Sequence, residues 1–167
     1  MRRNAFTLIE LIISIALFGL ISIFLFGAIE GLRKQQDFFQ KKEELIKQEN
    51  QILSLLRTDL DRPKSLTVSA TGSKDFDTVS INGSNRSLYG IDRPFVMWII
   101  LKVDNTLVRL ESAYPITLPI RPEALYLIHS DYIAKRCEIF RVYDSPKNRL
   151  VYLKSENHSP LVIETAK

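Results

Sequence analysis

One uncharged apolar stretch near the start of the chain constrains the fold most. It covers residues 11–29 and is bounded by Glu10 and Glu30. As an α-helix it would be roughly 28 Å long at 1.5 Å per residue, close to the hydrocarbon core of a bilayer, which is about 30 Å thick. We therefore predict a membrane-spanning helix, followed by a water-soluble domain in which charged residues are frequent.

The flanking charges favour a cytoplasmic N-terminus. Arg2 and Arg3 lie on the short side of the stretch, and positive residues favour the cytoplasmic side. Arg33 and Lys34 follow on the other side, so charge alone does not decide the orientation. A cleaved secretory signal is the competing interpretation, but its apolar run is usually about 7–15 residues and ends at a small-residue cleavage site. Residues 30–34, Glu-Gly-Leu-Arg-Lys, fit such a site poorly.

The acidic residue at the start of the apolar stretch is unusual. A carboxylate just inside an apolar helix is costly to bury, so Glu10 indicates a function. Residues 5–13 read Ala-Phe-Thr-Leu-Ile-Glu-Leu-Ile-Ile. This segment resembles the cleavage and methylation motif of type IV prepilins. The resemblance is close over residues 1–30, and beyond them it rests on architecture alone.

The resemblance implies roles for individual residues. Ala5 would precede the bond cut by a prepilin peptidase, and Phe6 would become the N-methylated first residue. Glu10 would pair with the N-terminal amine of a neighbouring pilin or pseudopilin subunit, and such pairing offsets much of the cost of placing both charges in lipid. The alternative for Glu10 is a favourable interaction with the dipole of its own helix. Two positions depart from the family pattern. The family usually has Gly where this chain has Ala5, and it often has proline where this chain has Gly27.

Residues 31–62 are predicted to continue the helix into water. They are rich in Glu, Lys, Gln and Leu, which favour helices. Apolar pairs recur every seven residues and form a narrow seam, and Pro63 ends the helix. We expect the second half of the seam to pack on the chain's own sheet, and a coiled-coil dimer is the alternative.

After Pro63 the apolar pattern changes to period two, which is typical of strands. Asn82-Gly83, Asp104-Asn105 and residues 145–148 are predicted turns, and the proline-containing segment 114–122 is expected to be irregular. No βαβ spacing occurs, so the sheet should be antiparallel. The predicted strands are 66–69, 78–81, 95–103, 106–112, 124–129, 138–143, 150–154 and 161–164.

The predicted fold class is therefore α+β, with a long N-terminal helix packed on an antiparallel β-sheet head, as in the pilin roll. The first half of the helix would span the membrane. The predicted divisions are a leader (1–5), a transmembrane half-helix (6–30), a periplasmic half-helix (31–62) and a β-rich head (63–167).

No catalytic constellation stands out, so we expect neither an enzyme nor a bound metal or cofactor. His129 and His158 are the only histidines, and His129-Ser130-Asp131 is expected to be a strand end and turn. Asp59 and Asp61, and Asp75 and Asp77, could bind calcium only within a complete ligand loop. We expect a solvated helix end at the first pair and a loop at the second.

The remaining candidate residues are expected to be structural. Trp98 should lie in the core. Cys137, the only cysteine, should be a small buried residue, with an intermolecular disulfide as the alternative. The head's basic residues should form an ordinary mixed surface, with a DNA-binding patch as the alternative. These basic residues are Arg86, Arg93, Arg109, Arg121, Lys135, Arg136, Arg141 and Arg149.

These observations predict a structural protein with a single membrane pass and a periplasmic head. It would be a minor pilin or pseudopilin of a type IV pilus, a type II secretion system or a DNA-uptake filament. The alternatives are a tip subunit that binds DNA or a secreted protein, and an uncleaved membrane-anchored enzyme. Its partners would be prepilin peptidase, other pilin subunits and the inner membrane, before incorporation into a periplasmic or surface filament.

Overall fold

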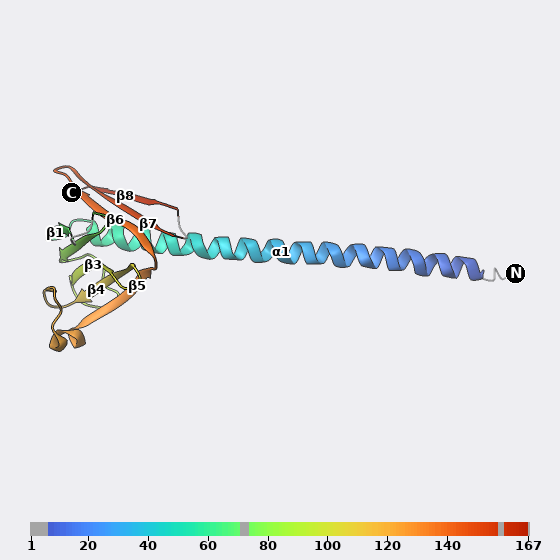
Figure 1. The fold of residues 1–167 in the computed structure, drawn as a ribbon, viewed down its shortest axis with the longest axis horizontal. Coiled ribbons are helices and arrows are strands. Elements are labelled where there is room, and N and C mark those ends of the chain that lie inside the picture. Colours follow the sequence, from blue (N-terminus) through green and yellow to red (C-terminus); the bar gives the residue numbers. More distant parts are fainter. Residues whose placement is uncertain (1–6, 71–73, 157–158, 167) are drawn as a thin grey trace. The chain divides into compact units, whose positions relative to one another are not determined.

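The computed structural model describes residues 7–70, 74–156 and 159–166, and these form one long helix followed by strands (Figure 1). The chain divides into two compact units, residues 1–46 and residues 47–167, here called the N-terminal unit and the head unit. The elements are α1 (Leu8–Leu60), β1 (Ser65–Ala70), β2 (Asp77–Asn82), β3 (Phe95–Leu101), β4 (Thr106–Ser112), the 3₁₀ turn η1 (Pro122–Leu127), β5 (Ile128–Ala134), β6 (Cys137–Asp144), β7 (Asn148–Ser155) and β8 (Leu161–Ala166).

The N-terminal unit is helix α1 up to Ile46. No proline interrupts the sequence from Leu8 to Leu60, so every residue can keep its backbone hydrogen bond. None of residues 8–46 is buried. The apolar side chains of this unit are therefore left without a partner within the unit.

In the head unit, the last turns of α1 enter the hydrophobic core. Ile52, Leu56 and Leu60 are buried, and their spacing of four residues places them on one helix face. The prediction that the end of the seam packs on the chain's own sheet is confirmed. The helix ends at Leu60, and Arg62 adopts a positive φ of 48° just before Pro63.

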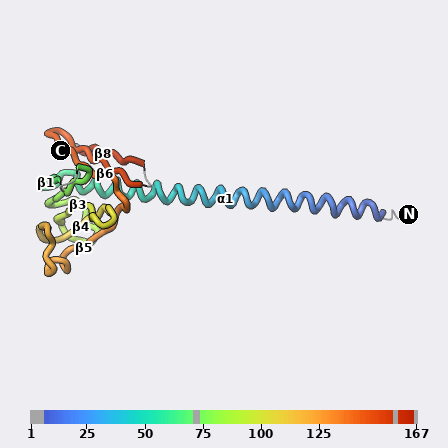
Figure 2. The backbone as a smooth tube through the Cα atoms, in the orientation of Figure 1, coloured from blue at the N-terminus to red at the C-terminus, as the bar shows by residue number. Residues whose placement is uncertain are grey.

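Two antiparallel sheets, rather than one, form the head unit. One has the strand order β1-β2-β3-β4-β5 and the other the order β6-β7-β8. A parallel bridge between Phe76 and Phe140 links them. The main core cluster contains side chains of α1 and of both sheets, and Figure 2 shows the end of α1 running between β3–β5 and β6–β8.

The five-stranded sheet is buried on both faces at β4. Leu107 faces α1 in the main core cluster, whereas Val108 and Leu110 belong to a second cluster. Ile116 and Ile120 pack on this second cluster. The segment 114–122, expected to be irregular, therefore covers the sheet face opposite the helix.

Two predicted local features are wrong. Residues 124–129 are not a strand, because most of them form the 3₁₀ turn η1, and β5 follows at Ile128–Ala134. Pro122 explains the turn, since its fixed φ and missing N–H suit the first position of a helical segment. Asn82-Gly83 is not a tight hairpin turn, because β2 ends at Asn82 and β3 begins only at Phe95.

Other local predictions are confirmed. Asn105, with φ of 52°, makes the turn between β3 and β4, and residues 145–147 connect β6 and β7. Trp98 and Cys137 are buried. Burial raises the pKa of the Cys137 thiol to about 11, which keeps it protonated and unreactive at neutral pH.

Candidate functional site

Thr7 and Glu10 close the N-terminus of α1 through reciprocal hydrogen bonds. The backbone N–H and the hydroxyl of Thr7 both donate to Glu10 Oε2, each at 2.9 Å. The N–H of Glu10 points back to Thr7 Oγ1 at 3.4 Å. This is a capping box, in which two side chains satisfy N–H groups that the helix leaves unpaired.

The capping box uses only part of the Glu10 carboxylate. Both bonds from Thr7 end on Oε2, and within residues 7–70, 74–156 and 159–166 no donor reaches Oε1. The side chain is exposed. Glu10 can therefore cap its own helix and still accept a bond from another chain, so its predicted role in subunit assembly stays a prediction. Ala5 and Phe6, the predicted cleavage and methylation sites, lie outside the described residues.

The helix that follows Glu10 presents apolar side chains all around. Leu8 is 77% exposed and Phe26 is 74% exposed. Within the described residues, α1 alone is long and apolar enough to cross a membrane, judged by length and composition. Such a surface is stable only against lipid or against other apolar helices.

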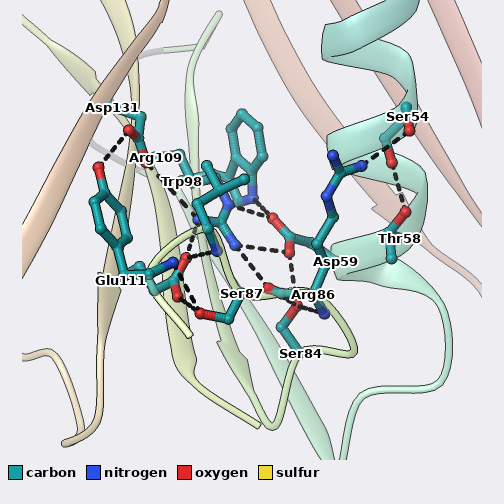
Figure 3. Close-up of polar contacts among 12 residues, drawn as sticks. Ser54, Thr58, Asp59, Ser84, Arg86, Ser87, Trp98, Arg109, Glu111 and Asp131 are labelled. Carbon is teal, nitrogen blue, oxygen red and sulfur yellow. Dashed lines mark hydrogen bonds and ion pairs between the residues drawn. The ribbon is translucent and has the colours of Figure 1, made fainter. Parts of the chain in front are cut away.

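A second polar site lies inside the head unit, around Asp59 in the last turn of α1 (Figure 3). The Asp59 side chain is fully buried, as is that of Arg109 in β4. Arg109 binds Asp59 through two bonds, from Nε to Oδ2 at 2.8 Å and from Nη2 to Oδ1 at 3.1 Å. Asp59 also accepts bonds from Trp98 Nε1 at 3.0 Å and from the Ser84 hydroxyl at 2.6 Å.

Arg109 holds a second buried carboxylate, that of Glu111 in the same strand. Its Nη1 donates to Glu111 Oε2, and Glu111 further accepts bonds from the Ser87 hydroxyl and, at 3.0 Å, from the N–H of Leu88. Asp131 of β5 lies 3.9 Å from Arg109 Nη1. We call Asp59, Arg109 and Glu111 the buried charge cluster.

The cluster stabilises the charged forms of Arg109 and Glu111. Burial lowers the pKa of Arg109, but hydrogen bonds and the charges of Asp59 and Glu111 outweigh burial and raise it on balance. Burial raises the pKa of Glu111, but hydrogen bonds from Ser87, Arg109 and Leu88 lower it on balance. The directions agree with the rule that opposite charges and donors favour ionisation.

The expectation of a solvated helix end is wrong for Asp59, and the expectation of a surface position is wrong for Arg109. Arg149, also assigned to the surface, is 9% exposed. Its Nη1 donates to the carbonyl of Leu60 at 3.0 Å. Each of these charges lies where α1 meets a sheet. Each has a partner at least fifty residues away in sequence, so a local pattern could not reveal that contact.

The sequence of the strand Thr106–Ser112 carries no signal that identifies Arg109. Alternate residues share a face, which groups Arg109 with Leu107 and Glu111 and places Val108 and Leu110 on the opposite face. One charged face and one apolar face are typical of a half-buried strand. Burial of both faces of β4 is seen only in the structure, and its charges must then find partners.

The segment His129-Ser130-Asp131 is part of a strand and is not arranged as a catalytic triad. His129, Ser130 and Asp131 are consecutive in β5, so Ser130 points away from the other two. His129 stacks on Tyr89, whose hydroxyl donates to Asp131 at 2.6 Å, which raises the pKa of Tyr89. The described residues hold no group of three or more His, Cys, Asp and Glu side chains suited to a metal ion. His158 lies outside them.

The prediction of a loop at Asp75 and Asp77 is wrong for Asp77. It is buried at the start of β2, and its carboxylate accepts the N–H of Val142 at 2.8 Å and lies 3.4 Å from Arg141 Nε. It therefore joins β2 to β6 and is not a free calcium ligand.

Comparison with known proteins gives one match. Residues 1–26 match the family model described as the prokaryotic N-terminal methylation motif. The chain matches no curated protein and no solved structure. The match covers Thr7, Glu10 and most of the apolar stretch, and it does not extend into the head unit.

Proposed function

We propose, from the premise that residues 1–26 make this chain type IV pilin-like, that it is a minor pilin or minor pseudopilin. In this proposal, a prepilin peptidase removes residues 1–5, and Phe6 becomes the methylated N-terminus. Residues 6–30 span the inner membrane with the N-terminus in the cytoplasm. Residues 31–62 and the head 63–167 lie in the periplasm, and the subunit joins a filament of the pilus, type II secretion or DNA-uptake kind.

The observation that carries the proposal is the exposed apolar surface that α1 presents within the matched residues 1–26. Leu8, Phe18 and Phe26 are each more than 70% exposed. Such a surface favours lipid before assembly and neighbouring helices afterwards. Glu10 supports packing against neighbouring helices, because its exposed carboxylate can pair with a neighbour's N-terminal ammonium when both leave water.

The part of α1 beyond the apolar stretch supports assembly with other helices. Phe38 and Phe39 are 64% and 56% exposed, and Leu45 and Ile46 are 40% and 47% exposed. They lie among charged residues, where lipid would not cover them. A neighbouring subunit's helix would bury them without requiring a coiled-coil repeat.

A minor subunit is favoured over a major one by two features. Major subunits of the family often close the C-terminal region with a disulfide, and the single Cys137 rules out an intrachain disulfide here. The head is also rich in strands, with eight in two sheets. Type IV pilin-like proteins are structural, so no catalytic residue is assigned.

The decisive experiment is intact-mass spectrometry with N-terminal sequencing of the protein from its native membrane. We expect a chain that begins at methylated Phe6, and a chain that begins at Met1 in cells that lack the peptidase. Ala5→Gly restores the usual family residue and should be processed at least as fast. A chain that begins at Met1 in cells with active peptidase would overturn the proposal.

A further inference from the structure

A short loop segment connects the end of α1 to the far edge of the five-stranded sheet. This segment, residues 84–89 between β2 and β3, is here called the strap. Every residue of the strap makes a polar contact with another element of the head unit. The contacts are Ser84 with Asp59, Asn85 with the carbonyl of Asp61, Arg86 with Ser54 and Arg109, Ser87 and Leu88 with Glu111, and Tyr89 with Asp131.

The charges of the buried cluster do not balance. Arg109 carries one positive charge, whereas Asp59 and Glu111 each carry a negative one, and all three side chains are fully buried. Arg109 and Glu111 lie in the same strand and neutralise each other without the helix. Docking of α1 therefore brings a second carboxylate into a buried site that already holds a matched pair, which is costly unless donors offset it.

The strap provides most of those donors. Four groups other than Arg109 donate to the two carboxylates: Trp98 Nε1, the Ser84 and Ser87 hydroxyls and the Leu88 N–H. Three of them belong to the strap. With the strap in place, each carboxylate has donors in addition to the one guanidinium. Without it, they would compete for Arg109.

We propose that the strap and the last turn of α1 form one cooperative latch, in which docking of either stabilises docking of the other through Arg109. The latch lies within the head unit and does not rest on the proposed filament role.

The test is hydrogen exchange measured by mass spectrometry on the full chain in detergent micelles. Ser87→Ala removes a donor to Glu111 and an acceptor for the N–H groups of Tyr89 and Ile91, and none of these bonds involves α1. We expect it to speed amide exchange in residues 54–60 by at least roughly fivefold, the low end of typical coupling between sites. Ser65→Ala, an exposed serine of β1, is the matched control and should leave that exchange unchanged.

The reciprocal variant is Asp59→Asn, which contacts the strap only at Ser84. We expect faster exchange in residues 87–91, beyond the residue that it touches, whereas Asp61→Asn should have no such effect. Emission from Trp98, the only tryptophan, reports whether each variant is folded. If Asp59→Asn does not fold, Ser87→Ala still tests whether the strap and the last turn of α1 are coupled. Faster exchange confined to residues 84–91 in Ser87→Ala, with residues 54–60 unchanged, would overturn the latch.

Discussion

At the scale of single residues, carboxylates do different work in the two units. Glu10 is exposed and completes a capping box with Thr7. Glu111 is buried and is kept charged by Arg109 and two donors of the strap. The difference comes from surroundings and not from chemistry, since water can stabilise the first charge whereas only protein donors can stabilise the second.

The two roles of Glu10 can be separated by substitution. Glutamine can replace glutamate in a capping box but carries no charge. We expect both Glu10→Gln and Glu10→Ala to insert in the membrane and to be lost from filaments, because neither pairs with an ammonium. The measurement is the amount of subunit in sheared or purified filaments. Glu30→Gln, at the other end of the apolar stretch, is the control and should assemble. Normal assembly of Glu10→Gln would mean that capping is the whole role.

The lowered pKa of Glu111 predicts a loss of stability in acid. The ordinary pKa of a glutamate is 4.5, and the folded value of Glu111 lies below it. Its contribution to the free energy of unfolding is therefore complete above the ordinary pKa and is lost as the pH falls through the folded pKa. We expect urea unfolding of the full chain in micelles, followed by Trp98 emission, to show this loss.

The control for this prediction is a glutamate on the surface. Glu111→Gln should unfold at lower urea at neutral pH and lose less stability on acidification than the wild type. Glu138→Gln removes an exposed ion pair with Lys154 and should keep the wild-type pH dependence. An equal loss between pH 5 and pH 3 in Glu111→Gln and the wild type would contradict the prediction.

At the scale of elements, α1 changes its role along its length. Residues 8–46 are unburied, whereas Ile52, Leu56 and Leu60 lie in the core of the head unit. The heptad spacing of apolar pairs runs from Phe38-Phe39 in the first part to Ile52-Leu53 in the second. What differs is whether a sheet of the same chain covers the seam.

This difference predicts unequal effects of the same substitution. Leu56 is 1% exposed, and Leu56→Ala should lower the free energy of unfolding of the head by about 2–5 kcal/mol, the usual cost of such a core cavity. Leu45 is 40% exposed, so Leu45→Ala should change it by less than about 0.5 kcal/mol. Denaturant titration followed by Trp98 emission measures both free energies of unfolding. Equal losses in the two variants would contradict the conclusion that Leu56, and not Leu45, lies in the core of the head.

At the scale of the whole molecule, the chain consists of two units whose apolar side chains are buried in different ways. The N-terminal unit has no core of its own and depends on lipid or neighbouring helices. The head unit has a core made from two sheets and the end of α1, with the buried charge cluster inside it. Stability and assembly can therefore be changed independently by substitutions in different units.

A chain that begins at Lys47 tests this independence. We expect residues 47–167 to be soluble without detergent, with a cooperative unfolding transition, because every member of the main core cluster and the buried charge cluster is retained. Circular dichroism and Trp98 emission would show it. The same chain with Leu56→Ala should unfold at lower denaturant. A shortened chain with no cooperative transition would show that the head requires the N-terminal unit.

Patterns close together in the sequence determined much of this protein. The apolar stretch, the Thr7-to-Glu10 spacing and the position of Pro63 define α1 and its end, because helix formation and capping depend on neighbours a few residues apart. Period-two alternation located most strands for the same reason. The methylation motif is also local, and residues 1–26 alone are enough to recognise it.

Only the tertiary structure decided where the charges lie and how the strands divide into sheets. Asp59 and Arg109 are fifty residues apart, and nothing near either residue shows that they meet. The 3₁₀ turn at Pro122 also escaped the local patterns, and Asn82-Gly83 wrongly indicated a tight hairpin turn, since packing against distant strands settles such choices. Burial depends on contacts between distant segments, and the charge of a buried residue is tolerated only when the fold brings a partner to it.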